Sequence, residues 1–98
     1  MNNLAELIPS DPSTTVAHGW RIVVLDRGWV LVGCCEDEGD ILRITKARCL
    51  RQWGTERGLG ELAAGPLEKT IHDYMGIVEA PKRAVIFSIV VASDAWDI

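Results

Sequence analysis

Short apolar segments separated by turn-forming residues recur along this chain and leave few folds open to it. They occupy 20–25, 29–35, 41–47, 76–80 and 84–91, and Gly, Asp or Pro residues stand between most of them. Residues 48–53 continue as an extended segment, and 59–64 form one or two helical turns that Gly65 and Pro66 terminate. Five or six short strands with one short helix predict a mainly β (β-rich α+β) fold, a small antiparallel barrel or curled sheet.

The chain is long enough for one domain, preceded by an arm. Residues 1–18 carry two prolines among serines and threonines and predict an N-terminal arm, which leaves 19–98 as a single β-rich domain. Hydrophobic residues make up 48% of the chain, more than a core of this size buries, so we expect a homo-oligomer. The longest apolar run is too short for a membrane helix and no leader pattern precedes it, which predicts a cytoplasmic protein without a membrane partner.

Three local features refine this reading. The segment 84–91 is apolar at nearly every position, which predicts a central strand covered on both faces. The alternation of side chains falters near Ala47, which indicates a β-bulge. Trp96, in the tail at 94–98, is expected to dock on the body of the domain.

The charge is segregated along the chain. Net charge is −4, yet residues 41–58 hold a single acid and five bases: Arg43, Lys46, Arg48, Arg51 and Arg57. An acidic chain repels duplex nucleic acid, so the basic segment suits one small anionic ligand better. The alternative is that these bases lie on solvated strand faces. The acidic segment 36–40 is too short for a calcium loop and is expected to be a solvated hairpin turn.

The cysteines and histidines do not predict a metal or cofactor site. Cys34, Cys35 and Cys49 show no C-x-x-C spacing, and only two histidines accompany them. We therefore expect no metal, no cofactor and no disulfide bond. Because neighbouring residues of a strand point to opposite faces, one of Cys34 and Cys35 should be buried and the other should face outward.

The segment 51–66 is the strongest candidate for a binding site. It combines a tryptophan, two arginines and four glycines with the start of the short helix, where backbone N–H groups favour an anion. Trp53 can stack on a base, and the arginines can hold a phosphate through two parallel hydrogen bonds. The predicted ligand-binding residues are Arg51, Trp53, Thr55, Arg57, Gly58, Gly60, Lys69 and Thr70.

The same region allows two other interpretations, a structural loop and a hydrolase site. The glycine spacing in 54–60 fits neither a Walker loop nor a dinucleotide fingerprint, so the segment can also be a compact structural loop whose Trp53 closes one end of the barrel. His72 next to Asp73 suggests a hydrolase, but no serine elbow or catalytic cysteine context accompanies the pair. We therefore do not expect an enzyme.

Several of these motifs resemble a family of short uncharacterised proteins of bacteriophages and prophages. The shared core is Trp53-Gly-Thr, then Gly58-Leu-Gly-Glu-Leu-Ala and Gly65-Pro, and the similarity covers roughly residues 20–92. The resemblance brings no catalytic residue with it. It implies a small phage-borne protein, either a particle accessory or an inhibitor of host defence acting in the bacterial cytoplasm, and some such inhibitors sequester nucleotide signals.

These observations together give a functional hypothesis. The chain is expected to be a non-enzymatic binding protein that sequesters a small phosphorylated ligand, by analogy a nucleotide second messenger of host antiviral defence. The alternative is a protein–protein interaction or phage structural accessory protein with no small-molecule ligand.

Overall fold

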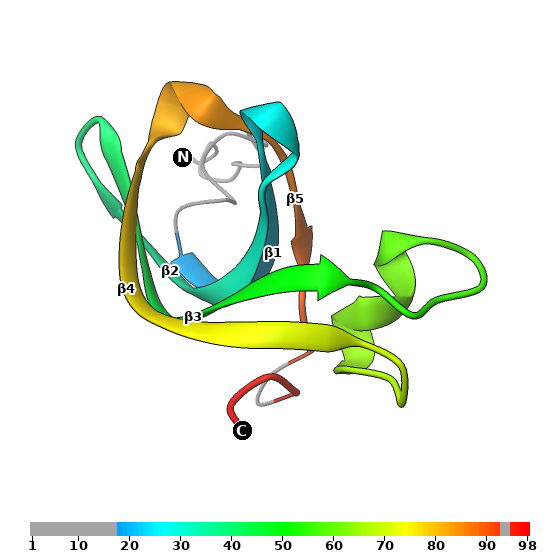
Figure 1. Cartoon of the computed structure of the whole chain (residues 1–98). Helices are drawn as coiled ribbons and strands as arrows, with labels where there is room; N and C mark the ends of the chain where they lie inside the picture. The colour runs from blue at the N-terminus through cyan, green and yellow to red at the C-terminus, as the bar shows by residue number, and fades with distance from the viewer. Residues whose placement is uncertain (1–17, 93–94) are drawn as a thin grey trace, which may run out of the picture.

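The computed structural model describes residues 18–92 and 95–98, so the predicted arm lies outside the described residues except for His18. Five antiparallel strands form one curled sheet in the order β4-β3-β2-β1-β5 (Figure 1). The strands are β1 (His18–Leu25), β2 (Val30–Glu38), β3 (Ile41–Gln52), β4 (Ile71–Pro81) and β5 (Val85–Val90). Short 3-10 helices are η2 (Asp26–Gly28), η3 (Leu59–Ala64) and η4 (Lys82–Ala84). The mainly β fold is confirmed as a curled sheet that does not close.

Both faces of the sheet are packed, because alternate residues of each strand point to opposite sides. One core cluster lines the inner face of the curl and contains Val23, Leu31, Leu42 and Ile44. The second cluster covers the outer face, where Leu62 of η3 and the tail residue Trp96 pack on strand residues such as Ile22. Trp96 is 1% exposed, and its indole Nε1–H donates to the carbonyl oxygen of Leu62 at 2.7 Å, so the predicted docking of the tail is confirmed.

The expected irregularity near Ala47 is a bulge between β2 and β3. The register shifts between Val32 and Cys34, opposite the point where Lys46 adopts a left-handed φ of 53°. Gly33 faces this bulge, and a methyl group there would lie 2.5 Å from Ile44 Cγ2 and 2.8 Å from the carbonyl oxygen of Thr45. The absence of a side chain at position 33 thus lets the bulged backbone close on β2.

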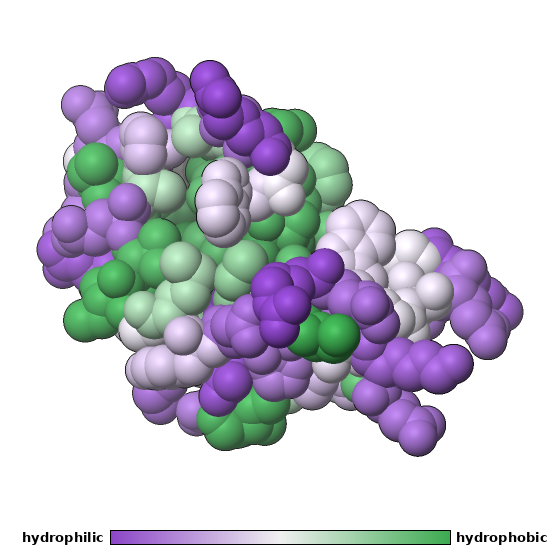
Figure 2. Space-filling model, in the orientation of Figure 1, coloured by the Kyte–Doolittle hydropathy of each residue, from purple (hydrophilic) through white to green (hydrophobic). Residues whose placement is uncertain are grey.

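The segment 84–91 is an edge strand, so the prediction of a central strand was wrong. Within residues 18–92 and 95–98, β5 pairs with β1 alone, and its side chains Ile86, Phe87 and Val90 are exposed. An apolar run on both faces is typical of a strand buried on both sides, but here it belongs to an edge strand whose apolar side chains are in contact with solvent. Figure 2 shows apolar atoms on the surface between the charged loops.

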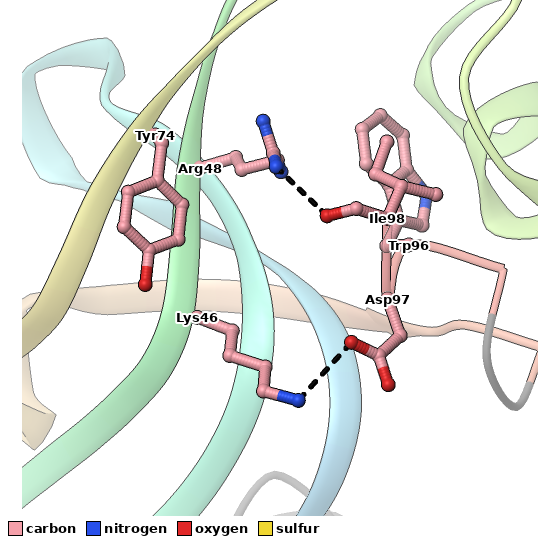
Figure 3. A pocket seen from close by; sticks show the side chains of 6 residues that line it. All are labelled: Lys46, Arg48, Tyr74, Trp96, Asp97 and Ile98. Carbon is pink, nitrogen blue, oxygen red and sulfur yellow. Dashed lines mark hydrogen bonds and ion pairs between the residues drawn. The ribbon is translucent and has the colours of Figure 1, made fainter.

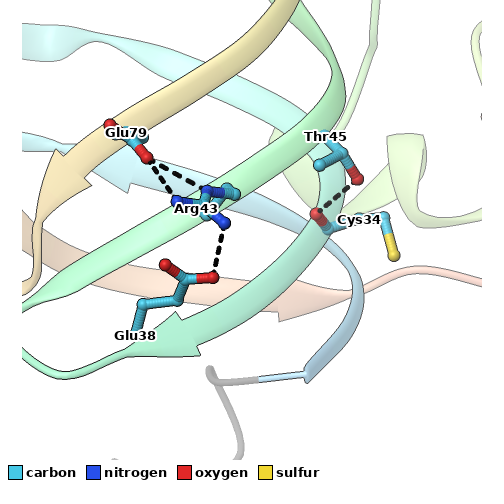
Figure 4. A network of polar contacts seen from close by, with 5 residues as sticks. All are labelled: Cys34, Glu38, Arg43, Thr45 and Glu79. Carbon is cyan, nitrogen blue, oxygen red and sulfur yellow. Dashed lines mark hydrogen bonds and ion pairs between the residues drawn. The ribbon is translucent and has the colours of Figure 1, made fainter.

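The acidic segment 36–40 is exposed, as expected for a solvated hairpin tip, but β2 extends to Glu38 and the turn itself is limited to residues 39 and 40. Its charges are paired across the sheet. Arg43 of β3 contacts Glu38 at 2.5 Å and Glu79 of β4 at 2.7 Å (Figure 4). Asp37 pairs with Lys82 in the same way. The segment therefore joins three strands and η4 at one end of the sheet.

The two adjacent cysteines face opposite sides, as predicted. Cys35 is buried, which raises the pKa of its thiol to about 12, whereas Cys34 is half-buried. All three cysteines are free, and no group of three metal-ligating side chains forms within residues 18–92 and 95–98. In the same part of the chain, no helix has the length and apolar character needed to cross a membrane.

Gly33→Ala should lower the free energy of unfolding by about 1–3 kcal/mol, because the new methyl group overpacks the bulge. Urea denaturation measures this. Gly60→Ala is the control: Gly60 lies in η3 with open space around it, so the change should be under about 1 kcal/mol. Equal stability of the two variants would show that the bulge does not require glycine.

Candidate functional site

Seven of the eight predicted ligand-binding residues lie along one excursion of the chain between β3 and β4, and Arg51 lies near the end of β3. The two ends of this excursion are fastened together by Thr70, whose hydroxyl donates to the carbonyl oxygen of Trp53 at 2.7 Å and accepts from the Leu67 amide at 2.8 Å. Gln52 donates to the carbonyl oxygen of Lys69 at 3.1 Å. Gly54, with φ of 70°, packs so closely on Lys69 that a side chain there would meet its backbone at 2.5 Å. Trp53, Lys69 and Thr70 are therefore brought together.

Of the Gly58 and Gly60 amides expected to hold phosphate in this loop, that of Gly58 has a partner inside the loop, as does the neighbouring Arg57 amide. The Gly58 amide donates to Thr55 Oγ1 at 3.2 Å, and the Arg57 amide donates to the Glu61 carboxylate. η3, which follows, is a six-residue 3-10 helix, too short to carry a substantial dipole. An anion at this point would have to displace the Thr55 and Glu61 side chains.

The cationic side chains of the predicted site differ in whether they already have a partner among the described residues. Arg51 is paired with Asp73 of β4, and the hydrogen bond from Arg51 lowers the pKa of the Asp73 carboxyl group. The side chains of Arg57 and Lys69 are exposed and have no ion pair or hydrogen-bond partner among the described residues. Gly60 is exposed, and Trp53 is partly exposed. The loop thus offers two free cations and an indole, but its main-chain anion site is occupied.

A second cluster of basic and aromatic groups lies between the bulged part of β3, strand β4 and the tail. A pocket of about 290 Å³ is lined by Lys46, Arg48, Tyr74, Trp96, Asp97 and Ile98. Figure 3 shows the side chains of Lys46, Arg48 and Tyr74 on one side of the pocket and the tail on the other. Arg48 and Tyr74 are register partners on β3 and β4, and the guanidinium carbon lies 5.3 Å from the centre of the tyrosine ring.

Both cationic side chains of this pocket contact the tail. Lys46 Nζ contacts Asp97 Oδ1 at 3.1 Å, and Arg48 Nη2 donates to the carbonyl oxygen of Ile98 at 3.0 Å. Arg48 Nη1 also lies 3.3 Å from Nδ1 of His72. Of the side chains that line the pocket, two are cationic and one is a carboxylate, and within the described residues no Asp or Glu side chain forms an ion pair with Arg48.

His72 links this pocket to the outer core. Its ring meets the Trp96 ring edge-on, with centroids 5.3 Å apart. Burial lowers the pKa of His72 below its ordinary value, the positive charge of Arg48 lowers it further, and Asp73 opposes both. A neutral imidazole that accepts a hydrogen bond from Arg48 at Nδ1 is consistent with this environment.

This pocket was not predicted from the sequence, for two reasons. Residues 69–74 did not show a clear strand pattern, so the pairing of Tyr74 with Arg48 was not foreseen. The bulge near Ala47 was foreseen, but its effect on the direction of Lys46 was not. The signal that could have found the site was the coincidence of that bulge with the basic segment 41–58.

Compared with known proteins, the chain matches no protein-family model and no curated protein sequence.

The low pKa of His72 should make stability depend on pH. Because the unfolded chain binds a proton more readily at this histidine than the folded chain does, the free energy of unfolding should fall as pH drops below about 6.5. Urea denaturation between pH 7.5 and 5.5 measures the slope, and NMR titration of the His72 ring gives its pKa directly. His72→Gln should flatten the slope in this range; an unchanged slope would assign the pH dependence to another group.

Proposed function

We propose that this chain is a non-enzymatic binding protein that sequesters a small phosphorylated ligand, with its phosphate at the pocket between Lys46 and Arg48. The observation that carries the proposal is Arg48, an arginine that forms no ion pair with a described Asp or Glu side chain and lies against an exposed aromatic ring. A phosphate can accept two parallel hydrogen bonds from the planar guanidinium group of Arg48, whereas the main chain of Ile98 accepts one.

The backbone of Lys46 supports a role for its side chain. A left-handed φ at a non-glycine residue is uncommon, and glycine would adopt it without steric cost. Strained positions of this kind tend to occur at functional sites. Lys46 is exposed and contributes nothing to the core, so a cation at the pocket rim is a reason for lysine at this position.

A nucleotide is the phosphorylated ligand that suits the site best. The Tyr74 ring, 63% exposed, can stack on a base, an interaction of about 1–3 kcal/mol per base. Arg57, Lys69 and Trp53 offer a second set of cationic and aromatic contacts in the neighbouring loop. The resemblance to bacteriophage and prophage proteins supports the narrower proposal of a nucleotide second messenger of host defence, held in the bacterial cytoplasm.

The alternative is a protein–protein interaction or phage accessory protein without a small ligand. Exposed apolar side chains on both edge strands favour it, among them Ile77 on β4 and Phe87 on β5. Such side chains provide contact area for another protein surface.

Lys46→Gly should abolish the stabilisation by ligand while leaving the unliganded protein as stable as the wild type or more so, because glycine relieves the backbone strain. The measurement is thermal unfolding with inorganic phosphate, cyclic di- and trinucleotides and cyclic ADP-ribose isomers. A ligand at 100 times its Kd adds about 2.7 kcal/mol to the wild type. Arg27→Gly is the matched control, since Arg27 also has a left-handed φ, of 65°, but lies outside the pocket.

Two outcomes would contradict the proposal. If no compound of the panel shifts the unfolding of the wild type, the chain has no ligand of this class and the interaction-protein alternative takes its place. If a compound shifts the wild type and Lys46→Gly equally, the pocket is not the site.

Arg57→Glu tests whether the loop between β3 and β4 contributes to ligand binding in addition to the pocket. The Arg57 side chain is exposed and unpaired within the described residues, so its replacement should change stability by less than about 0.5 kcal/mol. If the loop completes the site, the Kd for the nucleotide measured by calorimetry should rise roughly tenfold, the loss of one charge-assisted contact. An unchanged Kd would restrict the site to the pocket.

A further inference from the structure

The two edges of the sheet differ in how they are protected from pairing with another chain. Natural edge strands are usually guarded by charges, prolines or bulges. β4 carries His72, Asp73, Glu79 and Pro81. β5 has the sequence Val-Ile-Phe-Ser-Ile-Val, without a charge or a proline. Figure 1 shows β5 at one end of the curled sheet, with β1 on its inner side.

The register identifies which backbone groups of β5 are free to pair. Val90 lies opposite Arg21 of β1, and the Val91 amide donates to the carbonyl oxygen of Trp20 at 3.1 Å. In an antiparallel pair, hydrogen-bonded and non-hydrogen-bonded residues alternate. Phe87, Ile89 and Val91 therefore direct their N–H and C=O groups towards β1. Ser88 and Val90 direct theirs outward.

The free stretch of this edge is bounded at both ends. At its start, the register shift between Val24 and Leu25 makes Ile86 the extra residue of a bulge. Beyond its end, the Ala92 amide donates to the carbonyl oxygen of Ala63 in η3 at 2.8 Å. Among the residues that the structure describes, none pairs with the outer side of residues 87–91, a stretch symmetric about Ile89.

We propose that β5 is the interface of a symmetric homodimer in which residues 87–91 of two copies pair antiparallel. A two-fold axis at Ile89 places Ser88 opposite Val90 of the partner subunit, so both outward-facing residues of each copy make both of their backbone hydrogen bonds. The exposed side chains of Phe87 and Val90 are then covered by the same strand of the other copy. An uncharged strand meets its own copy without charge repulsion, and this favours a second copy over a charged partner.

The test uses the full-length protein and two variants at one position. Val90→Pro removes an outward N–H that the monomer does not use, and edge strands tolerate proline at such positions. Val90→Ala shortens the same side chain but keeps the N–H. Sedimentation equilibrium should give twice the 10.8 kDa of one chain for the wild type and for Val90→Ala, and the mass of a single chain for Val90→Pro. A monomeric wild type, or a dimeric Val90→Pro, would overturn the proposal.

Hydrogen exchange of the wild type provides a readout that does not depend on the folding of a variant. The amides of Ser88 and Val90 should exchange slowly at high protein concentration and faster on dilution, as the dimer dissociates. Rapid exchange of both amides in a protein of dimer mass would place the interface elsewhere. Protection independent of concentration would mean that another part of the same chain covers the edge. Either result contradicts the proposal, and neither bears on ligand binding at Lys46 and Arg48.

Discussion

The close contact between Gly33 and the bulged backbone at 45–47 is the constraint on which the rest of the structure depends. It allows β3 to change direction within one strand, so that its first half lines the inner core and its second half reaches out to η3 and the tail. The same bulge turns Lys46 away from the core and sets the spacing between Lys46 and Arg48. The change of direction in β3 and the placement of Lys46 relative to Arg48 therefore depend on the same bulge. A substitution that removed the bulge would remove both.

The basic residues of β3 differ in whether a carboxylate side chain already pairs with them, and this determines how well each can bind an external anion. Arg43 and Arg51 are engaged with carboxylates of β4, and their contribution is to hold two long strands in register. Exposed pairs of this kind add little to stability and leave little affinity for an external anion. Arg48 lies between them in sequence and faces groups without a full negative side-chain charge. Of these three arginines, Arg48 is therefore the one best able to bind an external anion.

Much of the fold could be predicted from the sequence, because strand boundaries depend on local patterns that a reader can count. The turns at 26–28 and 81–83, the bulge near Ala47 and the docking of Trp96 all follow from local residue types. The position of 84–91 at the edge does not, since an apolar strand has the same pattern at an edge and in the centre. The pocket was not predicted, because it depends on the cross-strand register of Arg48 with Tyr74 and on the place along β3 where the tail docks. The glycine-rich segment attracted attention for its composition, yet its Gly58 amide is bound by Thr55 a few residues away.

The burial of Trp96 has a consequence for the order in which the molecule can form. β1, β2 and β3 are contiguous in sequence and can assemble as a meander while the chain is being synthesised, with the inner core largely in place. The outer face cannot complete its packing at that stage, because the indole that fills it and binds Leu62 comes 34 residues later in the sequence. The nascent protein therefore carries an uncovered apolar surface until residue 96 has left the ribosome. For that interval the exposed apolar surface favours association with other unfolded chains.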